Sequence, residues 1–357
     1  MGRGRNPTIV DVAKSAGVSV AAVSKVLRDA KGVSPRMREV VTRAIEELDY
    51  RPMVGARSMR GASYTLGFVV PGAFSPFHSE IYAGVASELP GTPYRTIVAL
   101  HPCVTGDDDR QAIQDLLARQ VDGIILIEPM VPRAWLEDIA RRTPVVVVAR
   151  HDRSDVYDSV MGDDELGAQL VMRHLFELGH RDIVHIANRG AGDAEPDTPH
   201  GDWIRRQTYE RMMVEAGLTE HVKVVESRFD DHSAYHSMRE LLSSGHRPTA
   251  VFAGADDAAF GVLRALAELP TGAATSIAVV GYDNTRFADH PNMSLTSVDQ
   301  HGRELGRRAA ALVLDRLATK RPAVQQVLQP RLIVRRTSVR HSGVHVADAA
   351  YPLVPHP

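Results

Sequence analysis

The 357-residue sequence has a single cysteine, Cys103, so it cannot form a disulfide bond within the chain. Its apolar runs are short: Val145–Ala149, one of the longest, is far below the roughly 20 residues that a transmembrane helix needs. The first seven residues, MGRGRNP, are basic and polar and lack the apolar core of a secretory signal. From these absences we expect a cytoplasmic protein that has no membrane partner.

Motifs of the common catalytic and cofactor sites are missing as well. The sequence has no G-x-S-x-G nucleophile elbow, no P-loop, no G-x-G-x-x-G after a strand and no H-E-x-x-H. Its 16 histidines are scattered. The nearest pair, His232 and His236, is interpreted as an exposed helix face, and His200 and Asp202 are expected in a loop. The sequence therefore predicts no catalytic residue, no metal site and no cofactor.

Between Thr8 and Leu27 the sequence predicts two short helices separated by a tight turn. Thr8 followed by Asp11 is typical of a capping box at the start of the first helix, and Gly17 fits the left-handed residue at its end. Ser19 would then cap the second helix. Such a pair forms a helix-turn-helix, whose second helix can enter the major groove of DNA. An ordinary structural role in a helical bundle is the alternative.

A third helix and the charge distribution favour DNA binding over that alternative. Ser34 and Pro35 are typical of a helix start. Apolar side chains then recur at helical spacing, at Met37, Val40, Val41, Ala44, Ile45 and Leu48. Residues 1–60 contain 12 lysines and arginines against 6 aspartates and glutamates, whereas the remainder contains 30 against 38. A basic head on an acidic body suits a polyanionic partner at one end of the molecule.

The stretches DVAKSAGVSVAAVSKVL and VSPRMREVVTRAIEELDYRP, followed by ARSMR, resemble the DNA-binding head and hinge of the lactose-repressor (LacI/GalR) family of bacterial transcription regulators. The likeness extends to about Arg340. It implies a sequence-specific repressor that is controlled by a small molecule and binds a pseudo-palindromic operator as a homodimer. A non-catalytic solute-binding protein and an enzyme built on the same α/β body are the alternative interpretations.

The resemblance also implies which residues contact DNA. Val20 and Ala21 occupy positions that meet base edges and, being apolar, suit thymine methyl groups. Lys25 stands where an arginine is usual and can reach guanine as a point charge. In the hinge helix and linker, residues 51–63, Met59 replaces the usual leucine and would insert into the minor groove. The full set of implied DNA contacts is Thr8, Ser19, Val20, Ala21, Ala22, Ser24, Lys25, Arg28, Ser34, Ala56 and Met59.

After the hinge, short apolar runs alternate with amphipathic segments. TLGFVV, RTIVAL, GIILI and PVVVVA are typical of buried strands, and helices are expected at Ser79–Leu89, Asp108–Arg119 and Arg133–Arg141. The alternation then restarts with a helix over Leu166–Leu178 and strands at IVHIA, AVFAG and IAVVGY. The pattern predicts an α/β body of two doubly wound parallel-sheet lobes with a cleft between them.

The resemblance implies a body like that of the periplasmic sugar-binding proteins, in which the chain crosses between the lobes three times. The helix-turn-helix head would span residues 1–50. The first lobe would comprise residues 64–161 plus about 291–322, including Leu295–Val298 and a helix over Arg303–Leu317. The second lobe would comprise residues 162–290 plus about 323–340, including a strand over Leu332–Val334. Residues 341–357 are expected to form a disordered tail.

Ligands of open α/β sheets bind beyond the carboxyl ends of the strands. The resemblance places there Arg205, expected just before a helix, and Asp283. Phe229 and Gln300 match the positions of a stacking ring and a cleft amide. The alternatives are that Asp283 satisfies loop N–H groups and that Phe229 belongs to the core. The full set of implied effector contacts, which includes an apolar wall of two phenylalanines on the loop after the first strand, is Phe74, Phe77, His78, Arg150, Arg205, Phe229, Asp256, Asp283 and Gln300.

Three positions depart from the family's sugar-binding pattern. Where the family usually has a polar side chain, this sequence has Gly72 after the first strand, Ala149 after the fourth, and Ala255 in an Ala-Gly-Ala-Asp stretch. A buried hydroxyl left without a partner costs about 1–3 kcal/mol, so a monosaccharide would be held poorly. His78 and Arg150 indicate instead an acidic or larger, glycoside-like ligand.

Overall fold

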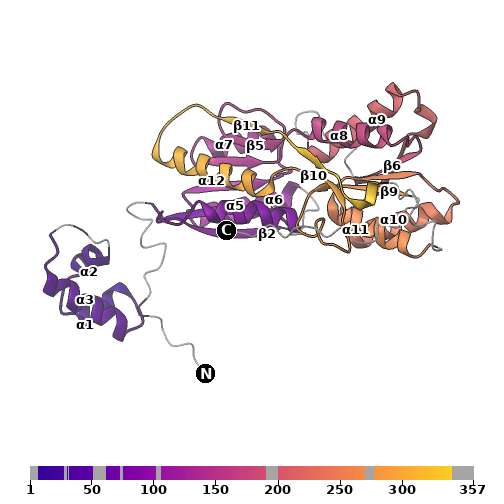
Figure 1. Cartoon of the computed structure of the whole chain (residues 1–357). Helices are drawn as coiled ribbons and strands as arrows, with labels where there is room; N and C mark the ends of the chain where they lie inside the picture. Colours follow the sequence, from indigo (N-terminus) through magenta and orange to yellow (C-terminus); the bar gives the residue numbers. More distant parts are fainter. Residues whose placement is uncertain are drawn as a thin grey trace, which may run out of the picture. The chain divides into compact units, whose positions relative to one another are not determined.

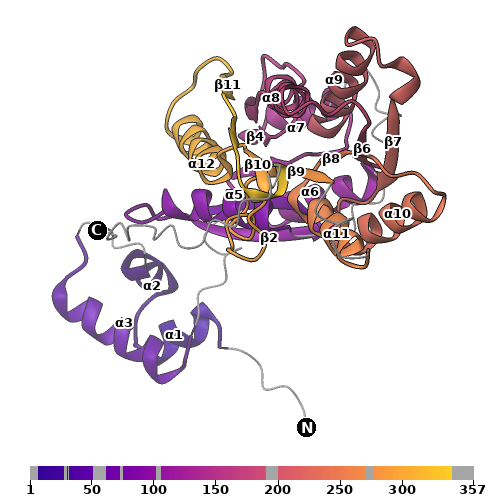
Figure 2. The same ribbon diagram turned by 45° about the vertical axis from the view of Figure 1, so that its right-hand side comes forward.

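The computed structural model describes residues 7–27, 30, 32–50, 62–72, 75–101, 106–189, 200–269 and 277–339. They belong to two compact units, a head that ends at Tyr64 and a body that begins at Thr65 (Figures 1 and 2). The predictions that lie outside the described residues concern Arg28, Ala56, Met59, Phe74, the hinge over 51–61 and the tail over 341–357. No helix in the described part of the chain is both long enough and apolar enough to span a bilayer.

The head consists of three helices, α1 (Ile9–Ser15), α2 (Val20–Leu27) and α3 (Pro35–Glu47). Their inward faces form a small apolar core, as the helical spacing of apolar residues in the sequence predicts. Gly17, with a φ of 64°, lies in the left-handed conformation at the end of α1. The buried members of this core are Val12, Ala13, Ala16, Val23, Val26, Val41, Ala44 and Tyr50.

Each predicted helix start in the head is confirmed by its cap. At α1, the Asp11 N–H donates to Thr8 Oγ1 (3.4 Å) and the Thr8 N–H donates to Asp11 Oδ2 (2.7 Å), which completes the capping box. Ser19 Oγ accepts the N–H of Ala22 at α2 (3.2 Å). The Ser34 hydroxyl caps α3 in the same way, at 3.2 Å from the backbone nitrogen three residues later.

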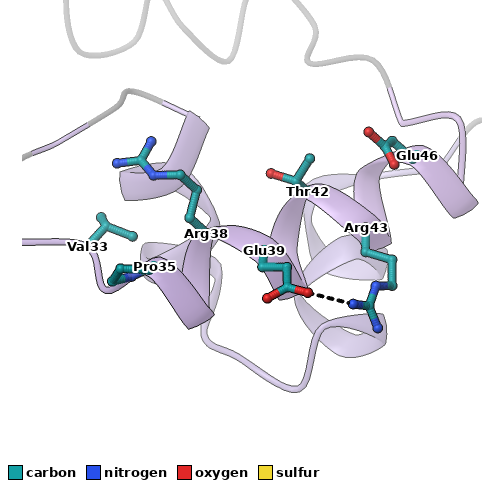
Figure 3. A pocket seen from close by; sticks show the side chains of 7 residues that line it. All are labelled: Val33, Pro35, Arg38, Glu39, Thr42, Arg43 and Glu46. Carbon is teal, nitrogen blue, oxygen red and sulfur yellow. Dashed lines mark hydrogen bonds and ion pairs between the residues drawn. The ribbon is translucent and has the colours of Figure 1, made fainter.

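A shallow hollow lies beside α3 (Figure 3). Its polar side chains are those of an exposed helix surface: Arg43 pairs with Glu39 at 2.9 Å, and both side chains are about two-thirds exposed. A pair of this kind stabilises a helix by only about 0.3–0.5 kcal/mol. We therefore assign no ligand to this hollow, whose lining is Val33, Pro35, Arg38, Glu39, Thr42, Arg43 and Glu46.

The first lobe of the body is a six-stranded parallel sheet in the order β11-β5-β4-β3-β1-β2. Its strands are β1 (Thr65–Pro71), β2 (Arg95–His101), β3 (Gly123–Ile127), β4 (Val145–Val148), β5 (Asp158–Gly162) and β11 (Gln325–Leu328). Its helices are α5 (Pro76–Ser87), α6 (Gly106–Ala118), α7 (Arg133–Ala140) and α12 (Gly302–Ala318). Helices α5 and α12 cover one face of the sheet and α6 and α7 the other, so β1, β3 and β4 are buried throughout and have continuous apolar sequences.

The second lobe is a six-stranded sheet in the order β12-β10-β9-β8-β6-β7, in which only β12 is antiparallel to its neighbour. Its strands are β6 (Ile183–Asn188), β7 (Lys223–Ser227), β8 (Ala250–Ala253), β9 (Ala278–Asp283), β10 (Thr296–Asp299) and β12 (Arg331–Ile333). Its helices are α8 (Asp164–Glu177), α9 (Gly201–Glu215), α10 (Asp231–Ser243) and α11 (Asp256–Ala267). Helices α8 and α9 pack on one face and α10 and α11 on the other, as in Figure 1.

The last crossings between the lobes differ from the prediction in two places. The prediction assigns Leu295–Val298 to the first lobe, but β10 pairs with β9 in the second-lobe sheet. It assigns residues from about 323 onward to the second lobe, but β11 pairs with β5 in the first. The physical reason is that both strands are only four residues long. Strands as short as TSVD and QQVL carry no information in their sequence about which sheet edge they join.

Helices α5 and α12 lie side by side in the first lobe and touch through their backbones (Figure 1). A Cβ atom on Gly84 would lie 2.0 Å from the carbonyl oxygen of Arg303, and one on Gly306 would lie 1.8 Å from that of Ile81. Both glycines are therefore required by the close approach of the two helices. This contact fastens the C-terminal part of the first lobe to its N-terminal part.

Candidate functional site

In the head, one face of α2 packs into the core and the opposite face is exposed. Val20 is 40% exposed, and Ala21 and Lys25 also lie at the surface, while Ala22 and Ser24 are half-buried. Thr8, Ser19 and Ser34, which are predicted DNA contacts, each cap a head helix by accepting a backbone N–H with the side-chain oxygen. The Thr8 hydroxyl donates to Asp11 Oδ2 (2.7 Å), whereas the hydroxyl hydrogens of Ser19 and Ser34 can be donated to a phosphate. The exposed face of α2 thus offers methyl groups and one cation to base edges.

In the body, the carboxyl ends of the parallel strands gather at one edge of each sheet. In the first lobe, β1, β3 and β4 are followed by Gly72, Glu128 and Ala149, and in the second lobe β6 and β9 end at Asn188 and Asp283. Side chains from the two edges are close enough for charges of the second lobe to act on Glu128. These strand ends and the helix starts beside them form the candidate effector cleft.

Arg205 is held tightly at the second-lobe side of this cleft. It lies in the second turn of α9 and not before the helix as predicted, because α9 already begins at Gly201. Its Nη1 donates to Asp164 Oδ1 at 2.5 Å, and its guanidinium carbon lies 4.5 Å from the centroid of the Tyr282 ring and 5.8 Å from that of Phe229. Its Nε has no hydrogen-bond partner in the described part of the chain, although the residue is only 7% exposed. This N–H is thus buried and unpartnered among the described residues.

Asp164, the first residue of α8, is buried between Arg205 and His151, whose Nε2 lies 2.7 Å from Asp164 Oδ2. Burial alone would raise its pKa, but the charge of Arg205 and the hydrogen bond with His151 outweigh burial and lower the pKa of Asp164 to about 2. Burial lowers the pKa of Arg205, but the charge of the Asp164 carboxylate outweighs burial, and the pKa of Arg205 is raised. Arg205 therefore enters the cleft with its charge already balanced.

Asp283 and Gln300 are brought together in the second-lobe part of the cleft. Gln300 Nε2 donates to Asp283 Oδ1 at 2.7 Å. The N–H of Asn284, in the loop that follows, donates to Ser297 Oγ at 3.0 Å and not to Asp283. Burial, followed by the charge of Asp256, raises the pKa of Asp283 well above its usual range. This arrangement supports a ligand-facing role for Asp283 over the loop-capping alternative.

Asp256 has an internal structural role, which corrects the prediction that it contacts the effector. It is fully buried and accepts hydrogen bonds from the N–H and hydroxyl of Thr285 (2.7 and 3.0 Å) and from Ser297 Oγ (2.6 Å). Burial raises its pKa to about 7 even though these hydrogen bonds lower it. Asp256 thus ties the start of α11 to β10 and to the loop after β9.

Arg150 holds the loop after β3, and its predicted role in effector binding is wrong. The residue is 0% exposed. Its Nη1 donates to the carbonyl oxygens of Pro129 (2.9 Å) and Val131 (2.7 Å), and its Nη2 donates to Asp152 Oδ2 (2.6 Å). The two carbonyl groups lie 21 and 19 residues away in the sequence, so no local pattern could reveal them.

The two described phenylalanines of the predicted set differ in their surroundings. Phe77 is the second residue of α5, belongs to the first-lobe core and packs against Gly302, so the predicted loop position and apolar wall are wrong for this residue. Phe229 is half-buried and packs against Gly254, where a Cβ atom would lie 2.5 Å from the ring. Because it also lies near Arg205, Phe229 remains a candidate for contact with a ligand.

Two cleft carboxylates were missed by the sequence-based prediction. Glu128 directly follows β3, and its Oε2 lies 4.0 Å from Nε2 of the predicted contact His78. Asp202 lies in the first turn of α9 and not in a loop, and its Oδ2 accepts a hydrogen bond from Asn188 Nδ2 at 3.0 Å. Burial, followed by the charge of Asp202, raises the pKa of Glu128 to about 7 against the opposing effect of Arg205. A carboxylate directly after a buried strand, GIILIE, is the signal that could have identified Glu128.

A capped helix-turn-helix joined to a two-lobed binding body defines a ligand-responsive regulator of transcription. The head matches the family described as bacterial regulatory proteins of the lacI family over residues 8–53, and residues 172–338 match a periplasmic binding protein-like domain. The chain is 33% identical over 336 residues to the HTH-type transcriptional repressor PurR of Yersinia enterocolitica serotype O:8. The aligned region covers 92% of this chain and 96% of that relative. The chain belongs to the lacI family of bacterial regulatory proteins, and it is a DNA-binding transcriptional regulator that responds to a small molecule.

Two solved structures share this architecture. The regulator CelR in complex with cellobiose is 29% identical, with a TM-score of 0.64 and coverage of 93% of this chain and 100% of that one. The lac repressor dimer bound to operator and the anti-inducer ONPF is 25% identical, with a TM-score of 0.73 and coverage of 94% and 100%. The family resemblance and the fold class inferred from the sequence are confirmed.

Proposed function

We propose that this chain is a cytoplasmic repressor that binds a pseudo-palindromic operator as a homodimer and changes its operator affinity when a small molecule binds between the lobes. The observation that carries the proposal is the exposed apolar and cationic face of α2, on a head whose three predicted caps are formed. The proposal gives the body no catalytic role. The effector belongs to the sugars, glycosides or related metabolites, in keeping with the cellobiose bound to the similar regulator.

The side chains of α2 set the expected mode of DNA reading. Val20 and Ala21 contact thymine methyl groups, and Lys25 reaches guanine O6 or N7. Because this surface offers few hydrogen bonds to bases, hinge insertion by Met59 and bending of the operator contribute a larger share of the specificity. An effector that contacts both lobes favours one relative pose of the lobes, and this preference is what changes operator affinity.

Selection of bound DNA from a random library tests the proposal. The full-length protein is expected to enrich a pseudo-palindrome, and a chain without residues 1–62 is expected to enrich nothing. The Lys25→Ala protein should still enrich the pseudo-palindrome but lose its preference at one base pair in each half-site. The binding free energy for the operator should weaken by about 1–3 kcal/mol. Lys14→Ala, which changes an exposed lysine of α1, is the matched control and should preserve the base preferences. No enrichment by the full-length protein, either alone or with metabolite extract added, would overturn the proposal. An unchanged profile for Lys25→Ala would show that Lys25 reads no base.

The edge strand β2 supports the dimer. Ile97, Val98 and Leu100 on this strand are 38%, 39% and 60% exposed, and an exposed apolar sheet edge is usually covered by a partner. Leu100→Glu should weaken dimerisation by at least about tenfold, because the new carboxylate would be desolvated in the interface. Sedimentation velocity measures this change. Val214→Glu, at a similarly exposed valine of α9, is the control; a Leu100→Glu protein that remains as dimeric as this control would place the interface elsewhere.

A further inference from the structure

A pocket with a volume of about 500 Å³ lies between the two lobes, outside the candidate effector cleft. Its volume is within the range of pockets that hold small molecules. The first lobe lines it with the loop after β4, the end of β5 and the edge strand β11, and the second lobe with the start of α8 and one face of α9. The cleft residues Arg205, Asp283 and Gln300 are not part of this lining. We call it the interlobe pocket.

The apolar side chains of the interlobe pocket suit a flat ring. Trp203 and Ile204, in the first turn of α9, are half-buried. Met161 of β5 is 6% exposed, whereas Val327 of β11 is 53% exposed. An indole ring and a thioether both make favourable contacts with an aromatic ring, beyond those of simple burial. The apolar part of the pocket therefore favours an aromatic ligand.

Most of the charged side chains in this pocket already have partners. Glu165 accepts a hydrogen bond from Arg211 at 2.7 Å, and His151 lies 2.7 Å from Asp164. Asp163 caps α8 by accepting a backbone N–H at 3.0 Å, and the positive end of the helix dipole balances part of its charge. These groups are therefore committed to interactions within the protein.

Two hydrogen-bond donors of the pocket remain without a partner among the described residues. The guanidinium of Arg153 makes no hydrogen bond or ion pair with them, since the bond recorded for this residue is accepted by its backbone carbonyl. The indole N–H of Trp203 likewise makes no hydrogen bond with them. Both side chains donate and neither accepts. The planar fork of an arginine matches the two oxygens of a carboxylate, whereas a cationic ligand would meet a like charge at Arg153.

We propose that the interlobe pocket is a second ligand site that takes aromatic carboxylates, and that such a ligand regulates operator binding alongside the effector. The carboxylate would bind Arg153, and the ring would pack against Trp203 and Met161. Because the lining comes from both lobes, the ligand would stabilise the relative pose of the lobes in which both sides contact it. The regulatory part of this inference rests on the proposed function, whereas the existence of the site does not.

The test uses three ligands of nearly the same shape and different charge: benzoate, benzamide and benzamidine. The sequence contains two tryptophans, so Trp135→Phe leaves Trp203 as the single fluorescent reporter in the full-length protein. We expect benzoate to change the Trp203 emission saturably, with a dissociation constant of about 1 mM or below for a ligand of this size. It should bind at least about tenfold more tightly than benzamide, and benzamidine should bind most weakly. Cyclohexanecarboxylate, which lacks the aromatic ring, should bind at least about threefold more weakly than benzoate.

Variants then locate the bound benzoate. Arg153→Gln should remove the preference for benzoate over benzamide, whereas Arg142→Gln, at another exposed arginine of the first lobe, should retain it. Asp283→Asn, in the effector cleft, should leave benzoate binding unchanged, and a loss of binding in this variant would place benzoate in the cleft instead. No response of Trp203 to any of the ligands, equal binding of benzoate and benzamide, or an undiminished preference in Arg153→Gln each overturn the site.

The regulatory part is tested on the operator that the selection experiment supplies. Saturating benzoate should change the operator affinity of the full-length protein at least about fivefold, and the same concentration should have no effect on Arg153→Gln. An unchanged affinity would overturn the regulatory part. The absence of any enriched operator would count against the proposed function and the regulatory part together, whereas the Trp203 titration decides independently whether the site exists.

Discussion

Replacement of Arg205 by alanine is expected to abolish the effector response and to lower the free energy of unfolding by about 3–5 kcal/mol. The side chain of Asp164 is 3% exposed, and in this variant its carboxylate would remain buried without the arginine partner at 2.5 Å. The ligand would also lose the free Nε–H of Arg205. Titration of operator affinity with effector measures the response, and urea denaturation measures the stability.

Two further variants separate the functional loss from the loss of stability. Arg206→Ala is the matched control, because Arg206 is the next residue of the same helix and its ion pair with Glu210 lies partly exposed. This variant should lower the free energy of unfolding by less than about 1 kcal/mol and leave the effector response intact. The double variant Arg205→Met/Asp164→Leu should recover most of the stability without the response, since it leaves neither charge buried alone. A normal response of Arg205→Ala would show that the effector binds elsewhere.

Gly306→Ala is expected to lower the free energy of unfolding by at least about 3 kcal/mol. Alanine in place of glycine within a helix normally stabilises by about 1 kcal/mol. Here, however, the added Cβ atom would lie 1.8 Å from the carbonyl oxygen of Ile81 in α5. The two helices must move apart to accommodate it, which opens the first-lobe core. The effect therefore has the opposite sign to the one that helix propensity predicts, and urea denaturation measures it.

Ala311→Gly is the control for this experiment, because Ala311 is an exposed position of the same helix. This substitution should lower the free energy of unfolding by about 1 kcal/mol through helix propensity alone. If Gly306→Ala were more stable than the unmodified protein, the contact between α5 and α12 could not be as tight as the structure indicates.

The sequence predicts the head more completely than the cleft because the head is determined by local interactions. Each cap in the head joins residues three positions apart, and a sequence pattern records such a pair directly. The two predicted cleft arginines show the contrast. Arg150 lies just after β4 and Arg205 lies within α9. Arg150 binds carbonyl groups of a distant loop, whereas Arg205 pairs with a carboxylate 41 residues away. Only the folded chain reveals these partners, and it leaves Arg150 fully buried and Arg205 7% exposed.

Glu128 escaped prediction for a related reason. The departures at Gly72 and Ala149 were visible in the sequence, but the order of strands in the sheet was not. Because β3 lies between β1 and β4, a carboxylate after β3 stands beside both positions. The parallel lobes themselves were predictable from the alternation of apolar runs and amphipathic segments, whereas the sheet membership of the short strands β10 and β11 depends on long-range pairing.

The elements β10, α12, β11 and β12 lie near the C-terminal end of the described chain, and this position has a consequence during protein synthesis. The head needs only the first 50 residues, whereas each lobe needs a strand beyond residue 295 to complete its sheet. At about 5–20 residues per second, a nascent chain would carry a DNA reader for roughly 15–60 s before its sensor could fold. A product that terminated before Gly302 would keep the head but lack α12 and β11, and therefore the backbone contact that fastens the first lobe. Premature termination would thus yield a DNA-binding head that no metabolite can control.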